Sequence, residues 1–168
     1  WAPTFVALAA IGVVYGAFVA MRQTDLKFVI GFSSVSHMGI VLLGLNLAVL
    51  GKAGADALNG AVFQMFAHGI MTALFFSTVG FIYDRVHSKT IADFGGLGSQ
   101  MPRAVSVFIV AGLCGAGLPG LASFWAELLV FLAALKTYPI VGVAVVAGLV
   151  ITALYVLRVF TQAFFGPP

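Results

Sequence analysis

Long apolar runs alternate with short clusters of charged residues along the whole chain of 168 residues. These clusters divide it into five apolar segments, at residues 3–21, 26–50, 57–83, 103–135 and 139–165, with Gly166-Pro167-Pro168 ending the last one. A helix needs about 20 apolar residues to cross the hydrocarbon core of a bilayer, and each segment has about that length or more. The segments lack the strict alternation of barrel strands. The pattern therefore predicts an all-α, polytopic membrane helix bundle with five transmembrane segments.

The fourth segment, residues 103–135, is too long for one simple span and contains Leu118-Pro119-Gly120 near its middle. Proline lacks a backbone N–H and clashes with the preceding turn, and glycine adds backbone freedom. We therefore predict two half-helices that meet at Pro119 and Gly120, with Glu127 about two turns beyond the break. A carboxyl group inside a membrane is costly unless it is protonated, paired or hydrated, so Glu127 is the strongest candidate for a functional residue.

Two histidines are expected at the depth of Glu127. His37, His68 and Glu127 each lie nine to twelve residues from a charged residue that marks a membrane boundary. Because a helix rises about 1.5 Å per residue, all three fall near the middle of the bilayer. Titratable groups separated by hydroxyls and water are what proton transfer through a membrane requires. The sequence predicts a proton path through these three residues, with secondary roles for Lys27, Ser36, Gln64, Pro119 and Gly120.

Composition and charge narrow the class further. The chain is 62% hydrophobic and only 8% charged, which excludes a soluble domain. Its single cysteine, Cys114, can form neither an internal disulfide nor a cysteine-based metal site. The basic residues are scattered over loops, so no nucleic-acid site is expected. Trp1 follows no initiator methionine and no basic leader, and we expect the chain to be an internal piece of a longer protein.

The distribution of basic residues predicts an orientation. If the first segment runs from outside to inside, two basic residues, Lys52 and Lys136, lie on the outer face. Six lie on the other face: Arg22, Lys27, Arg85, Lys89, Arg103 and Arg158. The positive-inside rule places these six in the cytoplasm, which fits a bacterial inner membrane. Five spans also leave the chain ends on opposite faces, as in one half of an inverted-topology repeat.

Several motifs in a fixed order resemble one known family. They are Thr24-Asp25-Leu26-Lys27, Ser33-Ser34-Val35-Ser36-His37-Met38-Gly39, Gln64-Met65-Phe66-Ala67-His68-Gly69, Tyr83-Asp84-Arg85, Gly95-Gly96-Leu97, Gly117-Leu118-Pro119-Gly120 and Phe124-Trp125-Ala126-Glu127-Leu128. Together they resemble the antiporter-like, proton-translocating subunits of respiratory complex I, the NADH–quinone oxidoreductase, over essentially the whole chain. A glutamate at position 127 is similar to the M-type (chain 4) members, because L- and N-type members usually carry lysine there.

The resemblance implies that the chain is part of one subunit in a multisubunit membrane complex. The chain looks like the second five-helix repeat of such a subunit, its helices 9 to 13, with residues 103–135 as helix 12. His37 and His68 then correspond to histidines of a central hydrophilic axis, and Glu127 to the acidic residue at the outward proton exit. The chain itself would be a translocase subunit that binds no cofactor, since NADH, FMN, iron–sulfur clusters and quinone belong to partner subunits. The implied partners are the L- and N-type subunits, small membrane subunits, the lateral helix of the L-type subunit and the lipid bilayer.

Other assignments are compatible with the sequence. Subunits of multisubunit Na⁺/H⁺ antiporters, membrane-bound hydrogenases and ferredoxin- or F420-linked complexes share the same pattern. From a different class, His37 and His68 could be the axial pair of a haem-binding electron carrier. Either histidine could also serve only as a hydrogen-bonding group between helices, in a scaffold repeat without transport.

Overall fold

The computed structural model describes residues 1–51 and 54–165. In this part of the chain the long helices are α1 (Ala2–Arg22), α2 (Leu26–Val49), α3 (Gly54–Val86), α5 (Pro102–Gly115), α6 (Ala122–Thr137) and α7 (Pro139–Val159). The short elements are η1 (Ile91–Asp93), α4 (Leu97–Gln100) and the π-helical turn η2 (Phe160–Phe164) that continues α7. The prediction of an all-α fold is confirmed. The boundaries predicted at Lys52 and at Gly166-Pro167-Pro168 lie outside the described residues.

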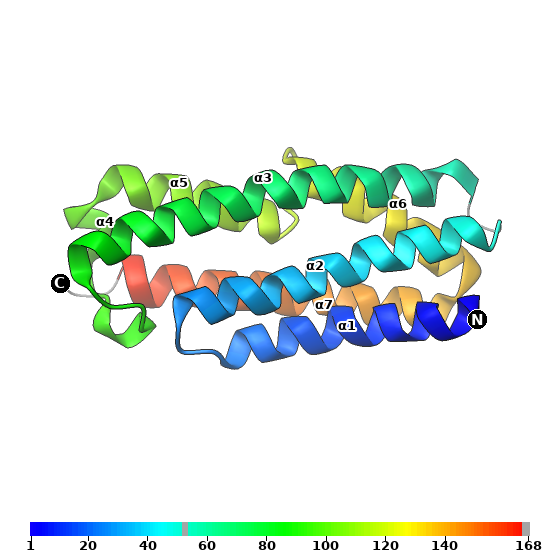
Figure 1. Ribbon diagram of the computed structural model, residues 1–168, viewed down its shortest axis with the longest axis horizontal. Helices are drawn as coiled ribbons and strands as arrows, with labels where there is room; N and C mark the ends of the chain where they lie inside the picture. The colour runs from blue at the N-terminus through cyan, green and yellow to red at the C-terminus, as the bar shows by residue number, and fades with distance from the viewer. Residues whose placement is uncertain (52–53, 166–168) are drawn as a thin grey trace.

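The long helices run side by side in an elongated bundle (Figure 1). Helix α1 packs against α2 and α7, and α3 packs against α2, α5 and α6. Three helices, α1, α2 and α3, and the continuous stretch Pro139–Phe164 are each long and apolar enough to cross a membrane. Helices α5 and α6 follow one another along the side of the bundle that carries α3, and their connection lies near its middle (Figure 1).

The predicted break in the fourth segment lies in the connection between α5 and α6. Helix α5 has 14 residues and α6 has 16, so each is shorter than the roughly 20 residues of a complete span. Gly117, with φ +68°, ends α5, because its N–H donates to the carbonyl of Cys114 and the N–H of Leu118 donates to that of Leu113. This pair of hydrogen bonds is the Schellman motif, which favours glycine at its left-handed position. Pro119 then prevents the helix from resuming at once.

A polar end of the bundle is formed where α1 meets α2. The side chain of Asp25 accepts a hydrogen bond from the N–H of Lys27 at 2.7 Å and so caps α2. The segment after α3 returns to this turn, since the N–H of Leu26 donates to the carbonyl of Lys89 at 2.9 Å. Arg158, near the end of α7, donates to the carbonyl of Met21 at the same end.

Glycines bring three helices together at the centre of the bundle. A Cβ atom at Gly60 of α3 would lie 2.8 Å from the carbonyl oxygen of Ala126 in α6. A Cβ atom at Gly44 of α2 would lie 2.9 Å from the carbonyl oxygen of Ala57 in α3. Membrane helices use small residues in this way, because backbones can then approach closely. The contact at Gly60 fixes the position of the residue that follows Ala126, which is Glu127.

Replacing Gly60 by alanine is therefore expected to destabilise the bundle. The added methyl group forces α3 away from α6, at a cost of about 1–3 kcal/mol. Gly69→Ala is the matched control on the same helix, because a Cβ atom there meets no atom within 4 Å. Thermal unfolding of the detergent-solubilised full-length subunit measures the difference. Equal melting temperatures for the two variants would contradict this account of the contact.

Candidate functional site

Three buried polar side chains meet where α2, α3 and α6 pack together. Nδ1 of His37 lies 3.2 Å from Oε1 of Glu127, and Nε2 of Gln64 lies 3.1 Å from the same oxygen. The third side of this triangle, from Nε2 of Gln64 to Nδ1 of His37, measures 3.3 Å. The three residues are at most 1% exposed. Each helix thus supplies one member of a cluster that is shut off from the surroundings.

The local sequence explains why these side chains meet. Gln64 lies one helical turn after Gly60, so both residues face α6. The close contact of Gly60 with α6 therefore places the side-chain amide of Gln64 within hydrogen-bond distance of the carboxyl group of Glu127. Glu127 is the sixth residue of α6, just after the break, and its neighbours on the buried face are Ser123 and Val130. The spacing of 123, 127 and 130 is that of one buried helix stripe.

The triangle can hold a proton in two places. An ionised carboxylate only accepts hydrogen bonds, so Glu127 in that form accepts from Nδ1–H of His37 and from the amide of Gln64. A protonated Glu127 instead donates its own O–H to Nδ1. Gln64 can donate to Oε1 in both arrangements, because a protonated carboxyl oxygen can still accept, whereas the single lone pair of Nδ1 is occupied in the second. One proton can therefore move between His37 and Glu127 while Gln64 remains hydrogen-bonded.

Each member of the triangle also carries one polar atom with no hydrogen-bond partner among the described residues. These atoms are Nε2 of His37, Oε1 of Gln64 and Oε2 of Glu127. Buried polar atoms normally have partners, so these three mark positions where a water molecule or a transferring proton would be stabilised. Oε2 of Glu127 faces Gly117 in the break, since a Cβ atom at Gly117 would lie only 2.8 Å from it.

His68 lies next to this triangle. Its ring centre is 5.6 Å from that of His37, with the planes tilted by 48°. Its Nε2 atom lies 3.1 Å from the hydroxyl of Thr72, one turn further along α3. The side chain is half-buried. The structure therefore brings His37, His68 and Glu127 into one row, as the sequence predicts, with His68 at its more exposed end.

The residues predicted in secondary roles separate into two groups. Gln64 belongs to the centre of the site. Ser36 does not, because its hydroxyl donates to the carbonyl of Val13 at 2.9 Å and so joins α2 to α1. Lys27 is exposed at the polar end, with Nζ 5.8 Å from the ring centre of Tyr83. Pro119 and Gly120 are exposed in the connection between α5 and α6.

One member of the site is not identified by the sequence reasoning. Gly117 has no polar side chain, and its motif indicates only a break in the helix. Its contact with Glu127 depends on how α5 and α6 fold back on each other. The positive φ of 68° and the contact distance of 2.8 Å together identify it as the residue beside Oε2 of Glu127.

The site has little space for a large cofactor. Among the described residues, no group of three or more histidine, cysteine or acidic side chains is arranged to hold a metal ion. A Cβ atom at Gly115 would lie 3.7 Å from Nε2 of His37, so that nitrogen faces the end of α5. The cavity beside Gly115 offers about 20 Å³ to the centre of a water molecule. This is room for about one water molecule and not for a haem.

The chain is similar to known proteins over nearly its whole length. It is 37% identical over 167 residues to NADH-quinone oxidoreductase subunit M of Pseudomonas aeruginosa, covering 99% of this chain and 32% of that protein. It matches a chain of respiratory complex I from Thermus thermophilus with a TM-score of 0.92 and 28% identity, covering 99% of this chain and 35% of that one. A chain of the Mrp complex from Dietzia sp. DQ12-45-1b matches with a TM-score of 0.92 and 25% identity, covering 100% of this chain and 31% of that one.

The chain thus spans about a third of the length of these relatives. Its apolar helices and its relatives make it an integral membrane protein. The resemblance inferred from the ordered motifs is confirmed, because residues 1–152 match the family model described as NADH:quinone oxidoreductase/Mrp antiporter, TM. The chain belongs to this family.

Proposed function

We propose that this chain is a proton-translocating repeat of an M-type subunit in the membrane arm of an NADH–quinone oxidoreductase. The observation that carries the proposal is the buried triangle of His37, Gln64 and Glu127 beside a broken helix. In this assignment the chain takes part in a translocase and performs no redox chemistry. NADH, FMN, iron–sulfur clusters and quinone belong to partner subunits.

The proton path follows from the order of the polar groups. A proton passes from His68 to His37, then from Nδ1 of His37 to Oε1 of Glu127 across 3.2 Å. It leaves through Oε2, which faces Gly117. A broken helix exposes backbone groups that can hydrogen-bond water inside a membrane, so the connection between α5 and α6 provides a polar way out. The ring centres of the two histidines are 5.6 Å apart, a separation that one bridging water molecule can span for the first transfer.

The driving force is electrostatic. In a low-dielectric interior a charge is felt strongly over several ångströms, so a charge arriving near the triangle shifts the proton between His37 and Glu127. Quinone reduction elsewhere in the complex would supply such changes. Because Gln64 can donate to Oε1 of Glu127 in either protonation state, the shift does not leave a buried donor unpaired.

The orientation follows from the polar end of the bundle. Arg22, Lys27, Lys89 and Arg158 belong to this end, and the positive-inside rule assigns it to the cytoplasm of a bacterial cell. The neighbours in the complex would be the L- and N-type subunits, small membrane subunits, the lateral helix of the L-type subunit and lipid. The chain would form helices 9 to 13 of its subunit and the second of two repeats.

Among the alternatives, the related transport complexes are the nearest. The similarity to a chain of an Mrp complex is compatible with a cation/proton antiporter subunit. The identity of 37% to a subunit M, over 99% of this chain, favours the quinone-linked assignment. A haem-binding carrier is disfavoured because the cavity beside Gly115 accepts only about one water molecule.

Glu127→Gln is the direct test of the proposed function. The amide keeps the shape of the side chain but cannot carry the proton, and we expect proton translocation through this path to fall by about 100-fold or more. NADH-driven proton uptake into inverted membrane vesicles that contain the assembled complex measures the effect. Asp56→Asn, an exposed carboxyl group at the start of α3, is the control. Normal pumping by Glu127→Gln at normal turnover would refute the proposed role.

Gly117→Ala tests the proposed way out. The methyl group would lie 2.8 Å from Oε2 of Glu127, so it should displace or cover that oxygen and slow translocation. Gly120→Ala is the matched control, since Gly120 also has a positive φ, of 100°, but a Cβ atom there meets no atom within 4 Å. Both variants carry backbone strain, and only Gly117→Ala should also slow pumping in the same vesicle assay. Equal pumping rates for the two variants would show that protons do not leave past Gly117.

A further inference from the structure

A second pair of buried polar side chains lies beside the triangle and takes no part in it. The hydroxyl of Tyr155 in α7 donates to Oγ of Ser33 in α2 at 2.8 Å. Tyr155 is 2% exposed and Ser33 is 5% exposed. Burying two hydroxyl groups in an apolar core is unfavourable unless they are hydrogen-bonded. Their bond satisfies one proton, that of Tyr155, and leaves the proton of Ser33 free to be donated elsewhere.

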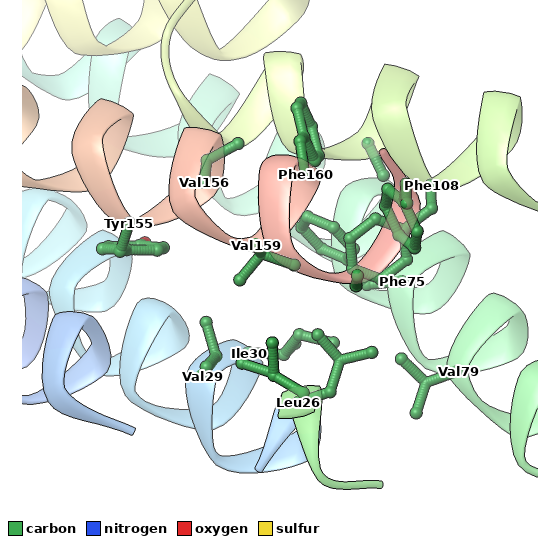
Figure 2. Packing of buried hydrophobic residues seen from close by; sticks show 14 of the residues in the cluster. Leu26, Val29, Ile30, Phe75, Val79, Phe108, Tyr155, Val156, Val159 and Phe160 are labelled. Atoms are coloured by element: carbon green, nitrogen blue, oxygen red, sulfur yellow. The ribbon is translucent and has the colours of Figure 1, made fainter. Parts of the chain in front are cut away.

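Ser33 and Tyr155 also line a cavity between α2, α3, α5 and α7. Ser33, Tyr155 and Gly115 form part of its wall, and the other lining side chains are apolar, among them Leu26, Phe75, Phe108 and Phe160. Tyr155 lies at one end of this apolar cluster, and Phe75 and Phe108 lie at the other (Figure 2). The cavity offers about 20 Å³ to the centre of a water molecule. One buried water needs about 10–15 Å³, so the space suits one water molecule and not a continuous file.

Gly115 lies between this cavity and the open nitrogen of the triangle. Gly115 borders both, because a Cβ atom there would lie 3.7 Å from Nε2 of His37, which has no hydrogen-bond partner among the described residues. Ser33 precedes His37 by one helical turn, which places their Cβ atoms about 5–6 Å apart. One water molecule with two hydrogen bonds of about 2.8 Å can join polar atoms about 5–6 Å apart.

We propose that Ser33 and Tyr155 form a hydroxyl relay that delivers protons to Nε2 of His37 through one water molecule in this cavity. This inference rests on the proposed function: it adds a second supply of protons to His37, beside the one from His68, and leaves release past Oε2 of Glu127 unchanged.

Protons and bonds balance along this relay. When a protonated water molecule donates to Oη of Tyr155, that water's O–H bond breaks and the tyrosine's own proton moves to Oγ of Ser33. The proton of Ser33 then moves to the water, and a proton of that water binds Nε2 of His37. The Nδ1 proton of His37 passes to Oε1 of Glu127 at 3.2 Å, so the imidazole returns to its neutral form. Each O–H or N–H bond that breaks is matched by one that forms, and no other reactant is consumed.

The apolar walls give the relay a physical advantage. A continuous file of water through the bundle would conduct protons in both directions and dissipate the gradient. The apolar side chains of Leu26, Phe75 and Phe108 restrict the cavity to about one water molecule beside the two hydroxyls. Transfer then depends on the positions of those hydroxyls, and these positions depend on the packing of α7 against α2.

Paired substitutions in the assembled complex test the relay. Ser33→Ala and Tyr155→Phe each remove one hydroxyl, and each is expected to slow proton uptake into inverted vesicles by about tenfold or more. The control for serine is Ser34→Ala, because the hydroxyl of Ser34 donates to the carbonyl of Ile30 in its own helix at 3.1 Å. The control for tyrosine is Tyr15→Phe, which is 59% exposed on α1. Ser33→Thr keeps the hydroxyl and is expected to keep pumping.

The outcomes separate the relay from the proposed function. Pumping by Ser33→Ala and Tyr155→Phe at the rates of their controls would overturn the relay, and a slow Glu127→Gln in the same assay would leave the proposed function intact. Normal pumping by all of these variants would overturn both. If Ser33→Thr were as slow as Ser33→Ala, with the melting temperature of the complex lowered in both, the pair would be a packing contact and the relay would be wrong.

Discussion

The buried carboxyl group of Glu127 constrains everything around it. A carboxyl group with 1% exposure in a membrane bundle is stable only if its charge is absent or is compensated by nearby donors. Gln64 and His37 meet that requirement from two other helices, at 3.1 and 3.2 Å. The compensation is incomplete, because each of the three residues retains one polar atom without a partner. A site of this kind holds a proton without fixing it to one residue, which is what a transfer step needs.

Close helix contacts make that compensation possible. Gly60 lets α3 touch the backbone of α6 at Ala126, and this contact brings Gln64 within reach of Glu127. Side chains larger than hydrogen at such positions would separate the helices by more than a hydrogen bond can span. The chemistry of the site therefore depends on residues that carry no functional group, and Gly117 beside Oε2 of Glu127 is the clearest example.

The two open ends of the triangle give it a direction. Oε2 of Glu127 faces the break at Gly117, whereas Nε2 of His37 faces Gly115, which also lines the cavity with Ser33 and Tyr155. Both ends are thus set by the last turns of α5, since Gly115 and Gly117 are two residues apart. A small movement of the break would change the surroundings of both atoms together. In the proposed mechanism, this short segment is where proton uptake and release are coupled.

The sequence by itself determined the apolar helices, the interruption of the fourth segment and Glu127 as the candidate functional residue. Apolar length defined the segments, Pro119 and the nearby glycines located the interruption, and the cost of a carboxyl group in lipid identified Glu127. Spacing from charged boundaries placed His37 and His68 at the same depth, because helix rise is regular. Only the tertiary structure decided which polar groups touch. Gln64 lies at the centre of the site, where it donates to Glu127. Ser36 instead joins α2 to α1 by a hydrogen bond to Val13. Tyr155 is hydrogen-bonded to Ser33, which is 122 positions away in the chain. Depth follows from position along one helix, but contact depends on how helices rotate and pack against each other, and that rotation is set by all of their neighbours at once.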